Sequence, residues 1–222
     1  RRDMDWDFIL QYRELYIDAA WLTIRTAALG ILGALLLGLI CGMIRYCRIP
    51  VLSRIIGMYI EVSRNTPLVI QLFFLYFGLP RMGITLESET CAVTGLIFLG
   101  GSYMAETFRS GLEAVGTIQT ESALGLGFRK MQIFFYILLP QAAAVAVPGI
   151  GANVMFLLKE TSVFSIVALA DLMYVAKDLI GLYYKTDEAL FLLTVSYLII
   201  LLPVSALFSL LERRLRYAGY GN

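Results

Sequence analysis

The chain has 222 residues, of which 59% are hydrophobic and 16% are charged, with a net charge of +1 and no histidine. A soluble domain carries about 25% charged residues, so this composition excludes an ordinary soluble domain and places the chain in the membrane class. The small net charge gives no field that would attract nucleic acid. The lack of histidine removes the commonest general base and metal ligand. We therefore expect no catalytic residue, no bound metal and no nucleic-acid partner.

The N-terminal twenty residues are acidic and aromatic, and they lack the basic start and apolar core of a cleavable signal peptide. Met4 fits a native start, which would make Arg1, Arg2 and Asp3 a remnant ahead of it. The length suits one domain. We expect residues 1–222 to form a single transmembrane domain.

Five apolar stretches are long enough to cross a membrane, which takes roughly 20 residues of helix. They are residues 20–44, 55–79, 90–108, 132–158 and 190–211. A weaker segment, 161–184, begins apolar and then becomes charged, which predicts a short helix at one membrane face; a sixth span is the alternative. The expected fold is an all-α membrane protein with five transmembrane helices.

Basic residues follow the first, third and fifth stretches, and Lys and Arg accumulate on the cytoplasmic side of membrane proteins. Acidic residues outnumber basic ones on the opposite side. This bias predicts an N-terminus outside and a C-terminus in the cytoplasm. The basic residues that carry it are Arg45, Arg48, Arg54, Arg109, Arg129, Lys130, Arg213, Arg214 and Arg216.

The segment ESALGLGFRKMQIFFYILLP, residues 121–140, interrupts the apolar pattern before the fourth stretch. We expect a short helix, a change of direction at Gly125 and Gly127, and then entry into the fourth span. The spacing fits the EAA pattern, which is E-A-A, three residues, G, nine residues and I-x-L-P, with Ser122 in place of the first Ala. The matching residues are Glu121, Ala123, Gly127, Ile137, Leu139 and Pro140.

This pattern resembles the cytoplasmic loop of type I ABC importer permeases. The resemblance implies that the loop at about residues 109–131 carries a coupling helix, which docks into a groove on a separate ATPase subunit. An ordinary amphipathic helix lying on the membrane is the alternative. The coupling residues implied by the resemblance are Glu121, Ser122, Ala123, Gly127 and Arg129.

Three further stretches resemble the polar amino acid permeases of this family, the histidine, glutamine and glutamate type. They are EVSRNTPLVIQLFFLYFGLP, GSYMAETFRSGLEAV and NVMFLLKETSVFSIV, which begin at residues 61, 101 and 153. The sequence departs from the pattern at four positions. Asn65 and Ser110 replace a usual Gly, Ser102 a usual Ala and Glu160 a common Asp.

The resemblance also implies an assembly. The sequence has no G-x-x-x-x-G-K-[ST] phosphate loop, so ATP and Mg would be bound by a separate ATPase dimer, with no cofactor on this chain. A symmetric ATPase pair needs two coupling loops, which implies a second permease chain, identical or closely related. An extracytoplasmic solute-binding protein would deliver a polar amino acid. The expected location is the bacterial plasma (inner) membrane, as a multi-pass protein in the lipid bilayer.

Polar residues inside apolar spans mark functional sites. Pro67 interrupts the backbone hydrogen bonds of the helix and would free the Ser63 carbonyl to bind an ammonium group. The alternative is that the kink serves helix packing only. Gln71 suits the ends of an amino acid, or an interhelical hydrogen bond. Arg64 is expected to pair with Glu61 at i,i+3.

Glu106 either faces the pathway with Tyr103 or pairs with Arg109 at i,i+3. The end of the fourth span offers an anion and two hydroxyls to an entering substrate, or forms a helix-end network. The middle of that span has no acidic residue, which disfavours a cationic substrate. The complete set of substrate-binding candidates is Thr66, Pro67, Gln71, Tyr103, Glu106, Asn153, Met155, Glu160, Thr161 and Ser162.

Other functions remain as alternatives at this point. A secondary transporter driven by an ion gradient would not need the EAA spacing, and the two halves show no inverted repeat. An ABC permease for a small solute other than an amino acid is the nearer alternative. An intramembrane enzyme is disfavoured, since the chain has neither histidine nor a G-x-S-x-G elbow.

Overall fold

The structure is a computed structural model that describes residues 4–219, with side chains as far as Leu215. The expected remnant Arg1–Asp3 and the side chain of Arg216 lie outside this description. All regular elements within it are helices. They are α1 Trp6–Tyr46, α2 Leu52–Arg64, α3 Leu68–Phe73, a π-helix Phe74–Gly78, a 3-10 helix Leu79–Met82, α4 Ser88–Glu113, α5 Thr117–Gly125, α6 Lys130–Ile133, a π-helix Phe134–Leu138, α7 Leu139–Glu160, a 3-10 helix Thr161–Val167, α8 Leu172–Tyr183 and α9 Thr186–Gly219.

Four helical segments of the described chain are long and apolar enough to cross a membrane: Trp6–Tyr46, Ser88–Glu113, Lys130–Val167 and Thr186–Leu215. They coincide with the first, third, fourth and fifth expected spans, and the first begins well before residue 20. The weaker segment 161–184 forms a 3-10 helix followed by the short helix α8. The expectation of a short helix there is confirmed.

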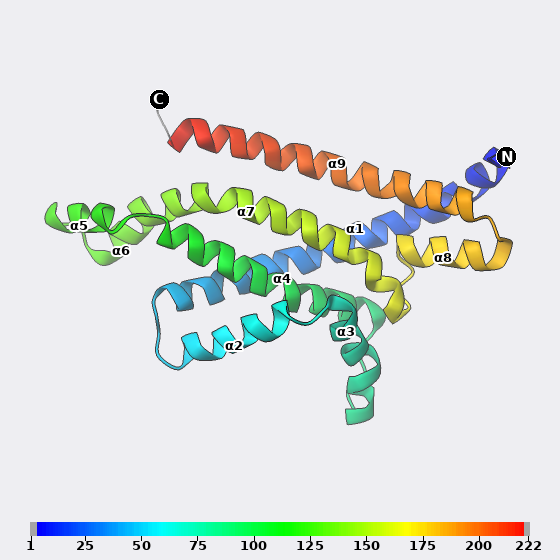
Figure 1. Ribbon diagram of the computed structural model, residues 1–222, viewed down its shortest axis with the longest axis horizontal. Helices are drawn as coiled ribbons and strands as arrows, with labels where there is room; N and C mark the ends of the chain where they lie inside the picture. Colours follow the sequence, from blue (N-terminus) through cyan, green and yellow to red (C-terminus); the bar gives the residue numbers. More distant parts are fainter. Residues whose placement is uncertain (1–3, 220–222) are drawn as a thin grey trace.

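The second expected span, residues 55–79, is interrupted at Pro67, where the sequence indicated a break in the helix. Helix α2 ends at Arg64, and α3 begins at Leu68 in a new direction (Figure 1). Pro67 lacks a backbone N–H and disfavours a helical conformation at the residue before it. The proline therefore separates two helices rather than bending one.

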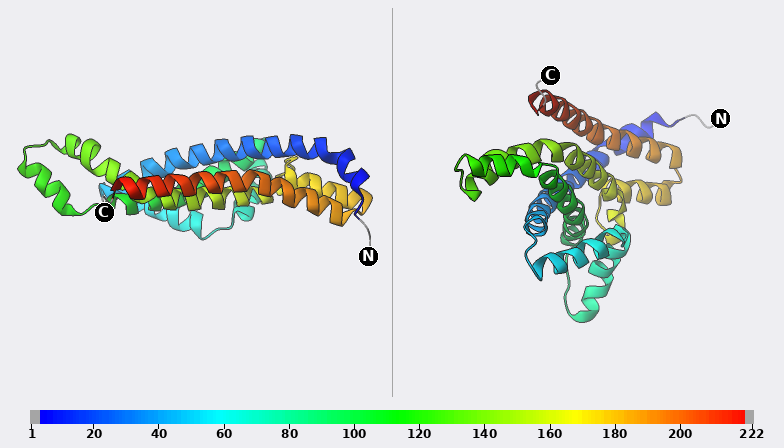
Figure 2. Two further views of the ribbon diagram at one scale, coloured as in Figure 1. Left: turned by 90° about the horizontal axis from the view of Figure 1, so that it is seen from above. Right: turned by 60° about the vertical axis from the view of Figure 1, so that its left-hand side comes forward.

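The long helices α1, α4, α7 and α9 run side by side along the longest axis of the molecule (Figures 1 and 2). The C-terminal ends of α1, α4 and α9 lie at one end, where α5 and α6 protrude beyond the bundle. The start of α1 lies with α8 at the other end. The basic residues that follow the first, third and fifth apolar stretches therefore lie at the same end of the molecule.

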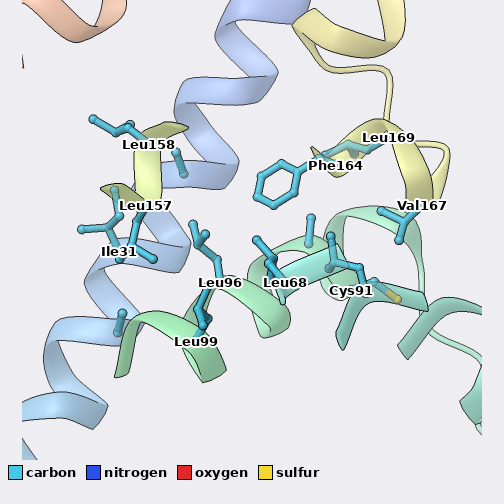
Figure 3. Close-up of a cluster of buried hydrophobic side chains, with 14 of the residues drawn as sticks. Ile31, Leu68, Cys91, Leu96, Leu99, Leu157, Leu158, Phe164, Val167 and Leu169 are labelled. Atoms are coloured by element: carbon cyan, nitrogen blue, oxygen red, sulfur yellow. The ribbon is translucent and has the colours of Figure 1, made fainter. Parts of the chain in front are cut away.

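The main core lies where α1, α4 and α7 meet the 3-10 helix that follows α7. Ile31, Leu96, Leu157 and Phe164 are its principal buried side chains (Figure 3). Small residues let α1 and α4 approach closely, as at Gly42, where a Cβ would lie 2.8 Å from a backbone oxygen of α4. This packing fixes the position of α4, which borders both cavities described below.

Candidate functional site

A cavity of about 340 Å³ lies between the end of α2, the second half of α4 and the middle of α7. We call it the polar cavity. Three of the ten candidate substrate residues line it: Tyr103, Glu106 and Asn153. The complete lining is Arg64, Tyr103, Glu106, Thr107, Ser110, Gly111, Val145, Ala146, Gly149 and Asn153.

Glu106 is the centre of an ion-pair network at this cavity. Its carboxylate accepts from Arg45 of α1 at 2.6 Å and from Arg109 at 2.7 Å, and Arg109 also pairs with Glu113 at 2.8 Å. Such charge-assisted hydrogen bonds are the stronger class. The expected i,i+3 pair is confirmed. Glu106 also lines this cavity together with Tyr103, and its place on the transport pathway stays a prediction.

Arg64 does not pair with Glu61, so that expectation is wrong. The Arg64 guanidinium lies over the Tyr103 ring, 4.9 Å from the ring centroid, where the negative face of the ring attracts a cation. Glu61 instead accepts from the Asn65 side chain at 3.3 Å. Arg64 is the last residue of α2, and this position carries it toward α4 and into the lining of the polar cavity.

Asn153, which lines this cavity, connects α7 to α4. Its amide nitrogen donates to the Thr107 hydroxyl at 2.8 Å, and that hydroxyl donates to the Tyr103 carbonyl at 3.1 Å. The lining of the polar cavity thus includes the Arg64 guanidinium, the Glu106 carboxylate and the uncharged amide of Asn153, and the guanidinium groups of Arg45 and Arg109 pair with that carboxylate. Cationic, anionic and uncharged polar groups therefore line one open cavity.

The break between α2 and α3 is closed by Gln71. Its amide nitrogen donates to the carbonyls of Ser63 at 3.1 Å and of Thr66 at 2.9 Å. The expectation that the Ser63 carbonyl is free for a ligand is therefore wrong, because this chain supplies the donor itself. The Thr66 hydroxyl is likewise used within the chain, donating to the Val62 carbonyl at 2.8 Å.

A second cavity, of about 420 Å³, lies between this break and the first half of α4. We call it the apolar cavity, because its lining surface is entirely apolar although Thr66 and Gln71 belong to it. The donors of both residues are directed to backbone carbonyls, as described above. The complete lining is Val62, Thr66, Ile70, Gln71, Phe74, Leu75, Thr94, Gly95 and Phe98.

The remaining candidates lie elsewhere. Thr161 is fully buried, donates to the Leu158 carbonyl at 2.8 Å and lies 3.2 Å from the Tyr197 hydroxyl, as the helix-end network predicts. Glu160 and Ser162 beside it are partly buried. Met155 lines a third cavity, of about 160 Å³, between α7 and α9, and Pro67 is the N-cap residue of α3. The ten candidates are therefore distributed over several places.

The segment after α4 forms the short helix and glycine break expected from the sequence. Helix α5 ends at Gly125, and Gly127 has a φ of 86°, a conformation that favours glycine. Ala123 is buried against Ile133 and Leu138. Glu121, Ser122 and Arg129 of this segment are exposed. The loop thus presents a polar face while its alanine anchors it to the start of the fourth span.

The polar site includes residues outside the ten sequence candidates, among them Arg64, which was expected only to pair with Glu61. Arg45 served only to orient the chain, and Thr107 was not singled out. Both act across long sequence separations, Arg45 on Glu106 and Thr107 on Asn153. The available signal was general: a cation at the end of one span and a carboxylate inside another favour pairing in a membrane.

Comparison with known proteins gives one family and close relatives. The model of the family "Binding-protein-dependent transport system inner membrane component" matches residues 34–217. The probable glutamine ABC transporter permease protein GlnP of Bacillus subtilis (strain 168) is 36% identical over 179 residues, which cover 79% of this chain and 82% of that protein. The glutamine transport system permease protein GlnP of Escherichia coli (strain K12) is 30% identical over 214 residues, covering 96% and 98%.

Solved structures give the same fold. A crystal structure of an amino acid ABC transporter with histidines contains a chain that is 30% identical to this one, with a TM-score of 0.88, over 96% of this chain and 100% of that chain. An inward facing structure of the MetNI methionine ABC transporter matches with a TM-score of 0.75 at 18% identity, over 92% and 98%. At 18% identity, the match to the methionine transporter supports the fold alone.

Proposed function

Because this chain belongs to the family of binding-protein-dependent transport system inner membrane components, we propose that it is the permease subunit of an ATP-driven importer for a polar amino acid. Membership of the family makes it a multi-pass inner-membrane permease and not a catalytic subunit. The two similar proteins from Bacillus subtilis and Escherichia coli carry the name glutamine permease. Glutamine is therefore our first candidate substrate.

The observation that carries this proposal is the polar cavity. A zwitterion brings a carboxylate and an ammonium group that must be desolvated together, and each hydrogen bond to a charged group is worth about 1.5–3 kcal/mol. Arg64 suits the carboxylate, Glu106 suits the ammonium, and Asn153 is a neutral partner for a polar side chain. We place Tyr103, Glu106 and Asn153 of the original candidates in contact with the substrate.

The charge balance of this site favours a neutral substrate side chain. The network contains the guanidinium groups of Arg45, Arg109 and Arg64 against the two carboxylates of Glu106 and Glu113, which leaves one positive charge in excess. A substrate with a cationic side chain would be repelled from this surplus. We propose that the substrate enters next to Glu160, Thr161 and Ser162. The other three candidates set the shape of the broken second span; they are Thr66, Pro67 and Gln71.

The topology we propose has five crossings, with α2 and α3 together forming a broken second span. The N-terminus lies outside and the C-terminus in the cytoplasm, over a single domain of residues 1–222. This orientation is supported by the basic segments, which share one end of the molecule with α5 and α6, since that end should face the cytoplasm.

The partners follow from the same orientation. The loop that contains α5 protrudes from the bundle, and we propose that it docks on an ATPase dimer, which binds ATP and Mg. The coupling residues are Glu121, Ser122, Ala123, Gly127 and Arg129. A second permease chain, identical or closely related, completes the pathway, and an extracytoplasmic binding protein delivers the substrate.

The substrate class is tested by competition for uptake in proteoliposomes that contain the permease, its ATPase and its binding protein. Glutamine or another neutral polar amino acid should compete for uptake and stimulate ATP hydrolysis, whereas arginine and lysine should not. If no amino acid competes while another small solute does, the chain is an ABC permease of a different specificity. Uptake that requires an ion gradient and no ATP would indicate a secondary transporter.

The coupling role is tested at Gly127. Replacing Gly127 by Val should uncouple ATP hydrolysis from uptake, because a β-branched residue tolerates positive φ poorly. A Cβ at this position meets no atom within 4 Å, so the effect would come from the backbone and not from crowding. Gly125→Val is the matched control, since its Cβ is equally unobstructed and its φ is not positive. Wild-type uptake and stimulated hydrolysis in Gly127→Val would exclude the role.

A further inference from the structure

The side-chain amide of Asn153 is held by two acceptors on α4. Its nitrogen Nδ2 donates to the Thr107 hydroxyl oxygen at 2.8 Å and lies 3.9 Å from the Met104 sulfur, which is a weaker acceptor. An amide nitrogen carries two hydrogens, so both donors of this side chain are used within the chain. The atom that Asn153 can offer to a ligand is therefore its carbonyl oxygen, Oδ1.

The Thr107 hydroxyl fixes which way round this amide lies. A hydroxyl has one hydrogen, and Thr107 donates it to the Tyr103 carbonyl one turn earlier in α4, at 3.1 Å. Thr107 can therefore only accept from Asn153. If the amide turned by half a rotation, Oδ1 would face the Thr107 oxygen and the Met104 sulfur, and neither has a hydrogen left to donate. One orientation alone satisfies both contacts.

The Oδ1 atom is accessible at the polar cavity. Asn153 lines that cavity, and no donor among the described residues forms a hydrogen bond with Oδ1. It is also not one of the buried side-chain atoms that lack a partner, so a ligand can reach it. The Ser110 hydroxyl on the same wall can donate or accept and does not discriminate between ligands.

We propose that this fixed acceptor selects a carboxamide side chain over a carboxylate, and thus glutamine over glutamate. The inference rests on the proposed function, in which Arg64 and Glu106 bind the two ends of the amino acid. A carboxamide has N–H donors for Oδ1, whereas an ionised carboxylate has acceptors only. Glutamate would lose hydration at Oδ1 without gaining a hydrogen bond. Thr107 acts as a positioning residue, through the orientation of Asn153.

The ion pairs of the site do not make this distinction. Their excess of one positive charge repels a cationic side chain, but it attracts a carboxylate. Arg64, the cation without a carboxylate partner in this network, is the group assigned to the α-carboxylate of the substrate. A preference for glutamine over glutamate therefore has to come from the uncharged part of the wall, where Asn153 presents its acceptor.

The test measures ligand binding by the permease–ATPase complex without its binding protein, so that the preference of the permease itself is observed. Bound radiolabelled glutamine is displaced by unlabelled glutamine or glutamate, and the readout is the ratio of the two inhibition constants. In wild type, glutamate should be weaker by roughly ten-fold or more. In Thr107→Val the amide loses its acceptor and can turn its nitrogen toward the cavity, so this ratio should fall by roughly five-fold.

Two variants serve as controls. Thr107→Ser keeps the hydroxyl and should keep the wild-type ratio. Thr194→Val removes the same kind of hydroxyl-to-carbonyl bond, from Thr194 to Leu190 at 2.8 Å, on α9 and outside the three cavities, and it should also keep the ratio. A wild-type ratio in Thr107→Val would overturn the proposal, and so would an equal fall in Thr194→Val.

Asn153→Asp gives a result that does not depend on how well Thr107→Val folds. An aspartate at this position presents acceptors only, so the ratio should rise above wild type, in the opposite direction to Thr107→Val. A ratio at or below the wild-type value would overturn the proposal. If the wild-type complex binds no glutamine at all, the proposed function itself fails, and the selection by Asn153 fails with it.

Discussion

The polar and the apolar cavity follow one another along the same helix, α4, and each is also lined by a residue near the end of α2. Both contain side chains with hydrogen-bonding groups. In the polar cavity, Glu106, Arg64 and Asn153 contact other side chains and also line the cavity. In the apolar cavity, Thr66 and Gln71 direct their donors to backbone carbonyls. The chemistry of a cavity is thus decided by where the hydrogen bonds go, and not by residue type alone.

The largest effect should follow from removing the charge at the centre of the polar cavity. Glu106→Gln leaves Arg45 and Arg109 without their shared carboxylate, and a charged hydrogen bond is worth about 1.5–3 kcal/mol. Uptake per folded transporter should fall roughly ten-fold or more. It is measured as initial uptake in proteoliposomes with saturating loaded binding protein.

The control for this variant is Glu89→Gln on the same helix. Glu89 is also ion-paired, to Arg25 at 2.6 Å, but it lines neither cavity. Because that pair is more exposed, its loss should cost less than about 1 kcal/mol and leave uptake unchanged. Equal losses in both variants would show that the polar cavity has no special role.

A smaller effect, and one on stability, is expected at the apolar cavity. Gln71→Leu leaves the carbonyls of Ser63 and Thr66 without their side-chain donor, which should cost about 1–3 kcal/mol. The unfolding temperature should fall, while uptake per folded transporter stays near wild type. The measurements are thermal unfolding and uptake on the same preparations.

Gln141→Leu is the matched control for Gln71→Leu. Gln141 is exposed on α7 and donates to the Ile137 carbonyl at 3.0 Å, where water replaces the lost donor. We expect almost no change in its unfolding temperature. If Gln71→Leu reduces uptake as strongly as Glu106→Gln without loss of stability, Gln71 contacts the substrate and the contrast between the two cavities fails.

The features that could be predicted from the sequence are local ones. Four of the helices could be predicted because a long apolar stretch of sequence is by itself enough to indicate a membrane-spanning helix. The EAA spacing placed a short helix and a glycine at residue 127, which has the positive φ that glycine favours. These signals lie within a few turns of chain and do not depend on packing.

The features that could not be predicted depend on tertiary contacts. Pro67 indicated an interruption, but the new direction of α3 is set by its packing on α4 and the turn after α7. The sequence left open whether Gln71 binds a ligand or makes an interhelical hydrogen bond, and its bonds to the backbone carbonyls of Ser63 and Thr66 were not predicted. The ion pair between Arg45 and Glu106 joins residues 61 positions apart, which no spacing rule reveals.

The smallest effect is expected at Asp171, a buried acid that lines neither cavity. Its Oδ1 accepts from the Tyr174 amide at 2.9 Å at the start of α8, and its Oδ2 has no hydrogen-bond partner within the described part of the chain. Burial raises the pKa of Asp171 from 3.8 to about 7. The neighbouring charged or titratable groups are Lys177 on α8 and Tyr197 on α9.

This raised pKa predicts how stability depends on pH. Between pH 4 and pH 7 the folded chain keeps the Asp171 proton that the unfolded chain has lost, so stability falls as the pH rises, and the full cost is present above about pH 7. Asp171→Asn keeps a capping oxygen and removes this cost. Its gain in stability over wild type should therefore grow from pH 5 to pH 8, to on the order of 1 kcal/mol or more.

The measurement is the unfolding temperature of the assembled transporter at both pH values, with Asp178→Asn as the control, because Asp178 is exposed on the same helix. A constant difference between Asp171→Asn and wild type would contradict the burial argument. Uptake per folded transporter at one pH should equal wild type, because Asp171 lies outside both cavities. A loss of uptake in Asp171→Asn alone would extend the polar pathway to the start of α8, and the division between a polar and an apolar cavity along α4 would then describe only part of the route.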